Sequence, residues 1–173
     1  IYHALGTSNL AVQVARFEDQ IAWLASNAEV VPLHELLTQD VHQSLQVSIT
    51  FDDGYGSVLD AAFPILDRYG FVATVYVNPG CISDVDRLPS NPAQGHYPTE
   101  SFMSWRDIKK LRDAGWSIGG HGVDHVDLTT LDSSSIDFQV GECQRIIERQ
   151  LDTSCMSFAY TWGRHSLAVR ESV

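Results

Sequence analysis

Residues 72–77 read Val72-Ala73-Thr74-Val75-Tyr76-Val77, an almost continuous run of apolar side chains. A strand with one face in water alternates apolar and polar residues, whereas a strand covered on both faces is apolar nearly throughout. Strands covered on both faces are typical of parallel sheets with helices packed over them. The run therefore predicts a buried parallel strand in an α/β protein.

Segments with helical and strand-like patterns alternate on both sides of this run. Helical spacing of apolar residues and capping signals predict helices at 17–24, from 34 onward, and at 58–66, 104–115 and 136–151. Short β-rich stretches predict strands at 1–4, 30–32, 46–51, 116–119 and 156–160. Such alternation predicts a parallel sheet with crossover helices, either open or closed into a barrel, with ligands at the carboxyl ends of the strands.

Polar residues follow several of these predicted strands. They are His3, Asp52 with Asp53, Asn78, His121 with His125, and the segment 160–162. Because the carboxyl ends of parallel strands meet at one edge of a sheet, we expect these side chains to surround one site.

Asp52-Asp53-Gly54 allows two readings. Taken alone, Asp-Asp-Gly is typical of a plain turn. A strand running into a turn would instead aim both carboxylates at one site, and Gly54 permits the necessary bend.

The sequence His121-Gly122-Val123-Asp124-His125 favours the second reading. An HxxxH spacing brings two imidazoles within reach of one cation, and a carboxylate completes a three-ligand site. Three protein ligands leave positions open for water or substrate, which is typical of catalytic metal sites. The alternative is that both histidines serve as helix caps or core residues.

Composition limits the class of protein. The 173 residues are 44% hydrophobic and carry a formal charge of −11, so we expect one folded domain that binds neither nucleic acid nor anionic lipid. No apolar stretch approaches the roughly 20 residues of a membrane span. The three cysteines are too few for a disulfide framework. The sequence opens on Ile1 without a charged or apolar signal segment, so we expect any secretion signal to have been removed or never to have existed. The compartment therefore stays open between the cytoplasm and, after removal of a signal, the periplasm or exterior.

These residues resemble the polysaccharide deacetylase family, the NodB-homology domain of carbohydrate esterase family 4. Thr50-Phe51-Asp52-Asp53-Gly54-Tyr55 is similar to its first motif, and His121–His125 with Asp127-Leu128-Thr129 is similar to its second. Tyr2-His3 resembles its first strand, and residues 158–163 resemble its third motif. The resemblance implies a distorted (β/α)7-type barrel of about seven parallel strands.

The resemblance also implies a set of site residues. Asp53, His121 and His125 would hold one divalent metal ion, expected to be zinc, and Asp52 would be the catalytic base. Trp162 would offer its backbone N–H to an oxyanion and its ring to the acetyl group. Further contacts to an acetylated oligo- or polysaccharide would come from Tyr55, Tyr160, Trp162 and His3.

Three departures from the family pattern affect these expectations. Gly122 stands where a Ser or Thr hydroxyl normally braces the second motif, and Ala159 stands where an arginine commonly orients the base. A late histidine that protonates the leaving amine would lie beyond residue 173. We therefore expect one deacetylase domain over 1–173, incomplete at its C-terminus. His165 and His3 are the spare histidines near predicted strand ends.

The predicted function is metal-dependent hydrolysis of acetyl groups from N-acetylated sugars. Alternatives are an inactive or binding-only relative, a relative that hydrolyses a non-sugar C–N bond, and an α/β domain whose acidic and histidine residues merely cap elements. The loop at 78–103, which holds four of the six prolines, is either a sugar-binding rim carrying His96, Tyr97 and Phe102 or a surface excursion.

Overall fold

A computed structural model describes residues 1–38 and 44–173. Its main sheet has the order β3-β4-β5, formed by β3 (Thr50–Phe51), β4 (Thr74–Val77) and β5 (Ser117–Gly120). All neighbours are parallel, with Thr50 opposite Thr74 and Thr74 opposite Ser117. All four residues of β4 are buried, so the predicted central strand is confirmed.

Single parallel bridges widen this sheet at both edges. Tyr2 pairs with Phe51 on one side, and Phe158 pairs with Gly120 on the other. The strands predicted at 1–4 and 156–160 are therefore reduced to isolated bridges. In the second segment Met156 is 87% exposed, so it lacks the burial that favours a residue in a strand.

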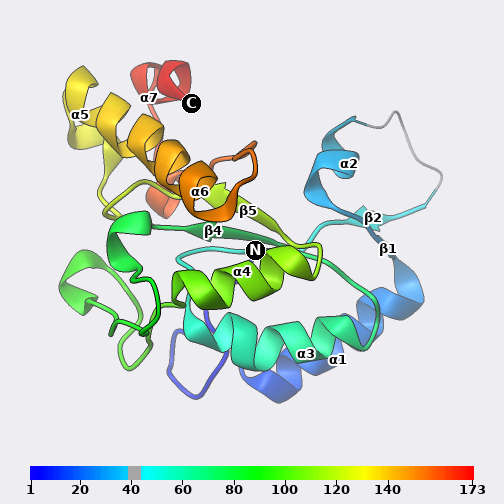
Figure 1. The fold of residues 1–173 in the computed structure, drawn as a ribbon. Helices are drawn as coiled ribbons and strands as arrows, with labels where there is room; N and C mark the ends of the chain where they lie inside the picture. The colour runs from blue at the N-terminus through cyan, green and yellow to red at the C-terminus, as the bar shows by residue number, and fades with distance from the viewer. Residues whose placement is uncertain (39–43) are drawn as a thin grey trace.

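Helices connect the strands and enclose the core (Figure 1). The long helices are α1 (Val14–Asn27), α4 (Trp105–Asp113) and α6 (Cys143–Leu151), and α3 (Phe63–Asp67) continues the π-helical turn η1 (Val58–Ala62). The shorter elements are η2 (Pro79–Cys81), η3 (Pro92–Gln94), η4 (Leu128–Thr130), α5 (Ser133–Asp137), the π-helical turn η5 (Phe138–Glu142), η6 (Thr161–Gly163) and α7 (Leu167–Ser172).

The core lies between the sheet and these helices. Helices α1 and α3 pack against each other, and α4 and α6 both contact β5. Fully buried members include Phe17, Phe51, Leu66, Ile108 and Ile147. Ser104 caps α4 as predicted: its Oγ accepts the Asp107 N–H at 3.3 Å, and Asp107 Oδ2 accepts the Ser104 N–H at 3.4 Å.

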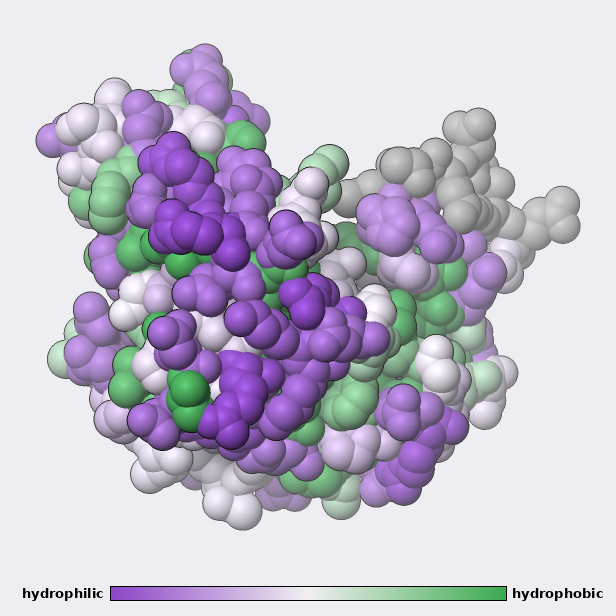
Figure 2. Space-filling view, viewed as in Figure 1, coloured by the Kyte–Doolittle hydropathy of each residue, from purple (hydrophilic) through white to green (hydrophobic). Residues whose placement is uncertain are grey.

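A second, two-stranded parallel sheet lies apart from the first, at the right of Figure 1. It pairs β1 (Glu29–Val30) with β2 (Gln46–Val47), and α2 (Leu33–Thr38) begins the connection between them. Figure 2 shows a notch between this part and the lobe formed by α5, α6 and α7, on a face covered mainly by hydrophilic side chains.

The expected (β/α)7 barrel is not confirmed. The described strands form one sheet of three and one of two, and neither closes on itself. The described part of the chain is an α/β fold whose parallel sheets are small and open, and the carboxyl ends of β3, β4 and β5 lie together at one edge.

Candidate metal centre and active site

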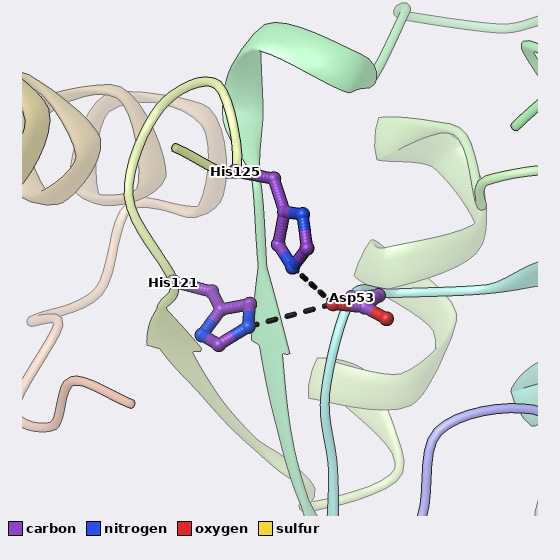
Figure 3. A group of neighbouring side chains, drawn as sticks. All are labelled: Asp53, His121 and His125. Carbon is purple, nitrogen blue, oxygen red and sulfur yellow. Dashed lines mark ion pairs between the residues drawn. The ribbon is translucent and has the colours of Figure 1, made fainter. Parts of the chain in front are cut away.

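Asp53, His121 and His125 meet at this edge of the sheet. Asp53 Oδ1 lies 3.4 Å from His121 Nε2 and 3.3 Å from His125 Nε2 (Figure 3). One ligand atom from each residue lies within 4.8 Å of the other two. All three side chains are buried, so few waters can compete for their lone pairs. The arrangement has the ligand types and spacing of a small divalent-ion site.

Backbone bends at the strand ends aim these side chains. Asp53 follows β3 with φ 68°, and Gly54 follows with φ 74°. His121 continues β5, its N–H donating to Val77 O at 3.0 Å, and His125 has φ 53°. A left-handed conformation at a non-glycine residue costs on the order of 1–3 kcal/mol, and such strain concentrates at functional sites.

The outer nitrogen of each imidazole is held by a backbone carbonyl. His121 Nδ1 lies 2.8 Å from Ala159 O, and His125 Nδ1 lies 3.0 Å from Gln94 O. Because a carbonyl only accepts, we assign a proton to Nδ1 in both rings, and Nε2 is the nitrogen that faces Asp53. Carbonyl contacts of this kind orient metal-binding histidines.

The electrostatics of the cluster favour a positive charge among its members. Burial alone would raise the pKa of Asp53, but the imidazoles of His121 and His125 outweigh it and hold that pKa well below its ordinary value. Burial would lower the pKa of His121, yet the Asp53 and Asp52 carboxylates raise it. Asp53 Oδ1 is buried without a hydrogen-bond partner. These donors therefore fit a bound cation.

Asp52 has an ion-pair partner of its own beside the cluster, the side chain of His3. Its Oδ2 lies 3.9 Å from His3 Nε2. Burial raises the pKa of Asp52, while the nearby His121 and His3 imidazoles oppose that rise. A carboxylate with a raised pKa beside the cluster is a candidate general base.

A cavity of about 830 Å³ opens over these groups. This is within the usual range of about 300–1,000 Å³ for small-molecule sites. Its walls include the cluster, Asp52 and a set of aromatic side chains, namely His3, Tyr76, Tyr97, Phe158, Tyr160 and Trp162.

Residues 41–173 match the sequence profile of the family described as polysaccharide deacetylase. The chain belongs to the polysaccharide deacetylase family. Two curated relatives are similar to it. YxkH of Bacillus subtilis (strain 168), named for this family, is 27% identical over 172 residues, covering 96% of this chain and 56% of the relative. The poly-beta-1,6-N-acetyl-D-glucosamine N-deacetylase of Staphylococcus aureus (strain MRSA252) is 23% identical over 168 residues, covering 90% and 54%.

The chain thus spans about half the length of these curated relatives. Two solved structures share its fold. The Streptococcus pyogenes deacetylase PplD in complex with acetate matches with a TM-score of 0.81 and 21% identity, covering 99% of this chain and 76% of that one. IcaB from Ammonifex degensii also matches with a TM-score of 0.81, at 22% identity and the same coverage. Among the described residues no helix has the length and apolarity needed to cross a bilayer.

Most of the residues that the sequence assigned to the candidate site surround the cavity. His3 stacks on Tyr97 with ring centroids 5.6 Å apart and planes 14° apart. Trp162, 49% exposed, meets His125 edge-on at 4.8 Å. Tyr160 lines the wall beside it. His165 is exposed and packs on Tyr160 without lining the cavity.

Tyr55 is the exception. Its side chain is fully buried, it does not line the cavity, and its hydroxyl accepts the Tyr97 N–H at 2.7 Å. Tyr55 follows the bend at Asp53 and Gly54, which turns it inward to pack on Phe102 with centroids 5.5 Å apart. Tyr55 therefore supports the cavity wall from behind.

The loop at 78–103 reaches the cavity with one of the three aromatic side chains that were expected there. Tyr97 lines it, but His96 and Phe102 are each only 2% exposed and pack against each other. Sequence reasoning missed the carbonyls of Gln94 and Ala159, since every residue carries a carbonyl. It also missed Tyr76, although an aromatic hydroxyl on a buried strand was a readable signal of a polar neighbour.

Proposed function

We propose that this chain removes acetyl groups from N-acetylated amino sugars of a polysaccharide by metal-dependent hydrolysis. One observation carries the proposal. Two imidazoles with carbonyl-held Nδ1 atoms and one buried carboxylate converge at the base of an open cavity, and a second carboxylate stands beside them. Family membership and the activity named for the Staphylococcus aureus relative support the substrate class.

In this proposal Asp53, His121 and His125 hold the cation, which we expect to be zinc. A divalent ion there would polarise the acetyl carbonyl and make a nearby water more acidic. Asp52 takes a proton from the attacking water as a C–O bond forms. We also assign the oxyanion contact to the backbone N–H of Trp162, and the acetyl methyl group to the space beside its ring.

Collapse of the resulting intermediate breaks the C–N bond and needs a proton for the departing nitrogen. His3 is the side chain we assign to this step, because it lines the cavity and its Nε2 faces Asp52 at 3.9 Å. The products are acetate and a free amino sugar. Tyr97, Tyr160 and Trp162 supply aromatic surface for the sugar rings on either side of the reacting group.

The test uses the zinc-loaded chain and chemically defined oligomers of β-1,6-linked and β-1,4-linked N-acetylglucosamine. We expect acetate release from at least one of the two, measured by a coupled acetate assay and by the mass of the product. Asp52→Asn should keep its zinc and lose about 10²–10⁴-fold in kcat, the range typical of general-base catalysis. Zinc loss in Asp52→Asn equal to that in Asp53→Asn would reverse the two assigned roles.

A binding-only relative is the second candidate, favoured by Ala159 in the position of a commonly found arginine. The same oligomers separate the two candidates. Binding detected by calorimetry with no acetate released from either oligomer would support the binding-only reading. Release of acetate would exclude it.

A further inference from the structure

The five-residue loop from His121 to His125 holds two of the three proposed ligands, yet it has little of its own to fix its shape. Gly122, at φ 78°, has no side chain, and the loop leaves the sheet directly after β5. Gly122 and His125 both have positive φ values, and a short segment with such a backbone would be free to change conformation. Other parts of the chain must therefore hold it.

Gln139 contacts the loop from one side. Its Oε1 accepts the Val123 N–H at 2.8 Å and the Asp124 N–H at 3.0 Å. Its Nε2 donates to Asp124 Oδ2 at 2.8 Å. Gln139 is only 6% exposed, and an ideal Cβ on Gly122 would come within 3.4 Å of its Oε1. The amide thus fills the space beside the residue that lacks a side chain.

Asn78 is the second side chain that contacts the loop. It follows β4 and is fully buried, and its Nδ2 donates to His121 O at 2.5 Å and Gly122 O at 3.1 Å. Between them the two amides bond backbone groups of residues 121, 122, 123 and 124. Gln139 lies in the π-helical turn η5, next to α6, which contacts β5 (Figure 1). Such turns occur frequently at functional sites.

We propose that Gln139 and Asn78 are positioning residues that set the spacing of His121 Nε2 and His125 Nε2 for the metal ion. The inference rests on the metal site of the proposed function. A buried side-chain amide that bonds several backbone groups at once leaves those groups unpaired when it is removed, so the loop would relax. Residues behind the ligands of a metal typically change its affinity by about 10–100-fold.

The experiment measures the dissociation constant of zinc by competition with a chromophoric chelator, without substrate. Gln139→Leu should weaken zinc binding by about 10–100-fold. Gln139→Glu should weaken it as well, because a carboxylate would face the Asp124 carboxylate. The exchange Gln139→Glu with Asp124→Asn restores one donor and one acceptor at that contact, so it should recover most of the lost affinity. Gln144→Leu, the same change at an exposed position of α6, is the matched control.

Cobalt substitution adds a readout of geometry, since the visible spectrum of bound cobalt should change in Gln139→Leu and return in the exchanged pair. Zinc affinity in Gln139→Leu within twofold of the unmodified chain, or no recovery in the exchanged pair, would overturn the inference. If Gln139→Leu does not fold, the zinc affinity of the exchanged pair, compared with that of Gln139→Glu alone, tests the inference. Zinc bound tightly without acetate release would contradict the proposed function and leave this inference standing, whereas an unmodified chain that binds no zinc would contradict both.

Discussion

His3 Nε2 lies 3.9 Å from Asp52 Oδ2, although one residue belongs to the first segment of the chain and the other follows β3. The bridge between Tyr2 and Phe51 brings them together, since it aligns the residues that come next on each segment. Tyr97 stacks against the His3 ring and limits its rotation. An imidazole and a carboxylate thus face the same cavity from adjacent segments.

Replacing His3 tests its role as the proton donor. His3→Gln should lower kcat about 10²–10⁴-fold on an N-acetylated sugar, because the departing nitrogen would lose its acid. The loss should be much smaller on an aryl acetate ester, whose leaving group needs no proton. Zinc content measured in parallel should not change. Equal losses on the amide and the ester would show that His3 serves binding or folding instead.

The proposed ligand set of Asp53, His121 and His125 predicts a clear pattern of zinc content. Elemental analysis of the purified chain should find about one ion per molecule. His121→Ala and His125→Ala should each abolish tight binding, because the remaining two ligands cannot hold the ion against water. His165→Ala, which removes an exposed imidazole that does not line the cavity, is the control. Unchanged zinc in both His121→Ala and His125→Ala would refute the ligand assignment.

The sequence predicted the side chains of this site better than their surroundings. Asp53, His121 and His125 could be predicted as candidate ligands because few residue types bind metals. The sequence also predicted that each of them follows a strand. The contacts of the Gln94 and Ala159 carbonyls with the histidines could not be predicted, since they depend on where the backbone lies. In the irregular loop at 78–103, neither strand nor helix periodicity indicates which aromatic faces inward, so only Tyr97 of the three expected rim residues lines the cavity.

The same distinction applies to the fold. The apolar run that forms β4 marked a covered strand because burial on both faces constrains nearly every position. The segment at 156–160 was also expected to be a strand, but it pairs with β5 only through the bridge from Phe158 to Gly120. Pairing partners far apart in the chain determine whether such a segment becomes a strand, and local composition does not report them.

Asp107 gives a prediction about stability at low pH. Burial would raise its pKa, but Arg87, at 2.8 Å, and Lys110, at 3.0 Å, outweigh it and lower the pKa to about 2. A carboxyl group whose pKa in the folded state lies below its ordinary value of 3.8 stabilises the fold above that pH. Its contribution is lost as the pH falls toward about 2. Asp107→Asn should therefore destabilise the chain at neutral pH and flatten its acid unfolding curve.

Thermal unfolding between pH 2 and 7 would measure this effect. We expect a loss on the order of 1–3 kcal/mol at neutral pH, because the substitution also weakens the cap of α4. Asp113→Asn on the same helix is the control, since that side chain is exposed and pairs only locally with Arg112. A pH dependence in Asp107→Asn that matches the unmodified chain would contradict the assigned cause.

Tyr97 is the residue of the long loop that we expect to read the polymer. Its ring stacks on His3 and lines the cavity, while its backbone N–H is anchored by the Tyr55 hydroxyl at 2.7 Å. A rigid aromatic face at the edge of a sugar site would cover the apolar face of a neighbouring ring. Tyr97→Ala should therefore raise KM for an oligomer of N-acetylglucosamine by about tenfold, the effect of about 1.4 kcal/mol in binding free energy. A small acetylated test compound, which fills only the reacting position, should show little change.

Phe102→Leu, at a buried position behind the wall, separates loss of loop structure from loss of a sugar contact, because it should affect both substrates equally. If Tyr97→Ala also changes both substrates equally, the ring supports His3 and does not contact the polymer.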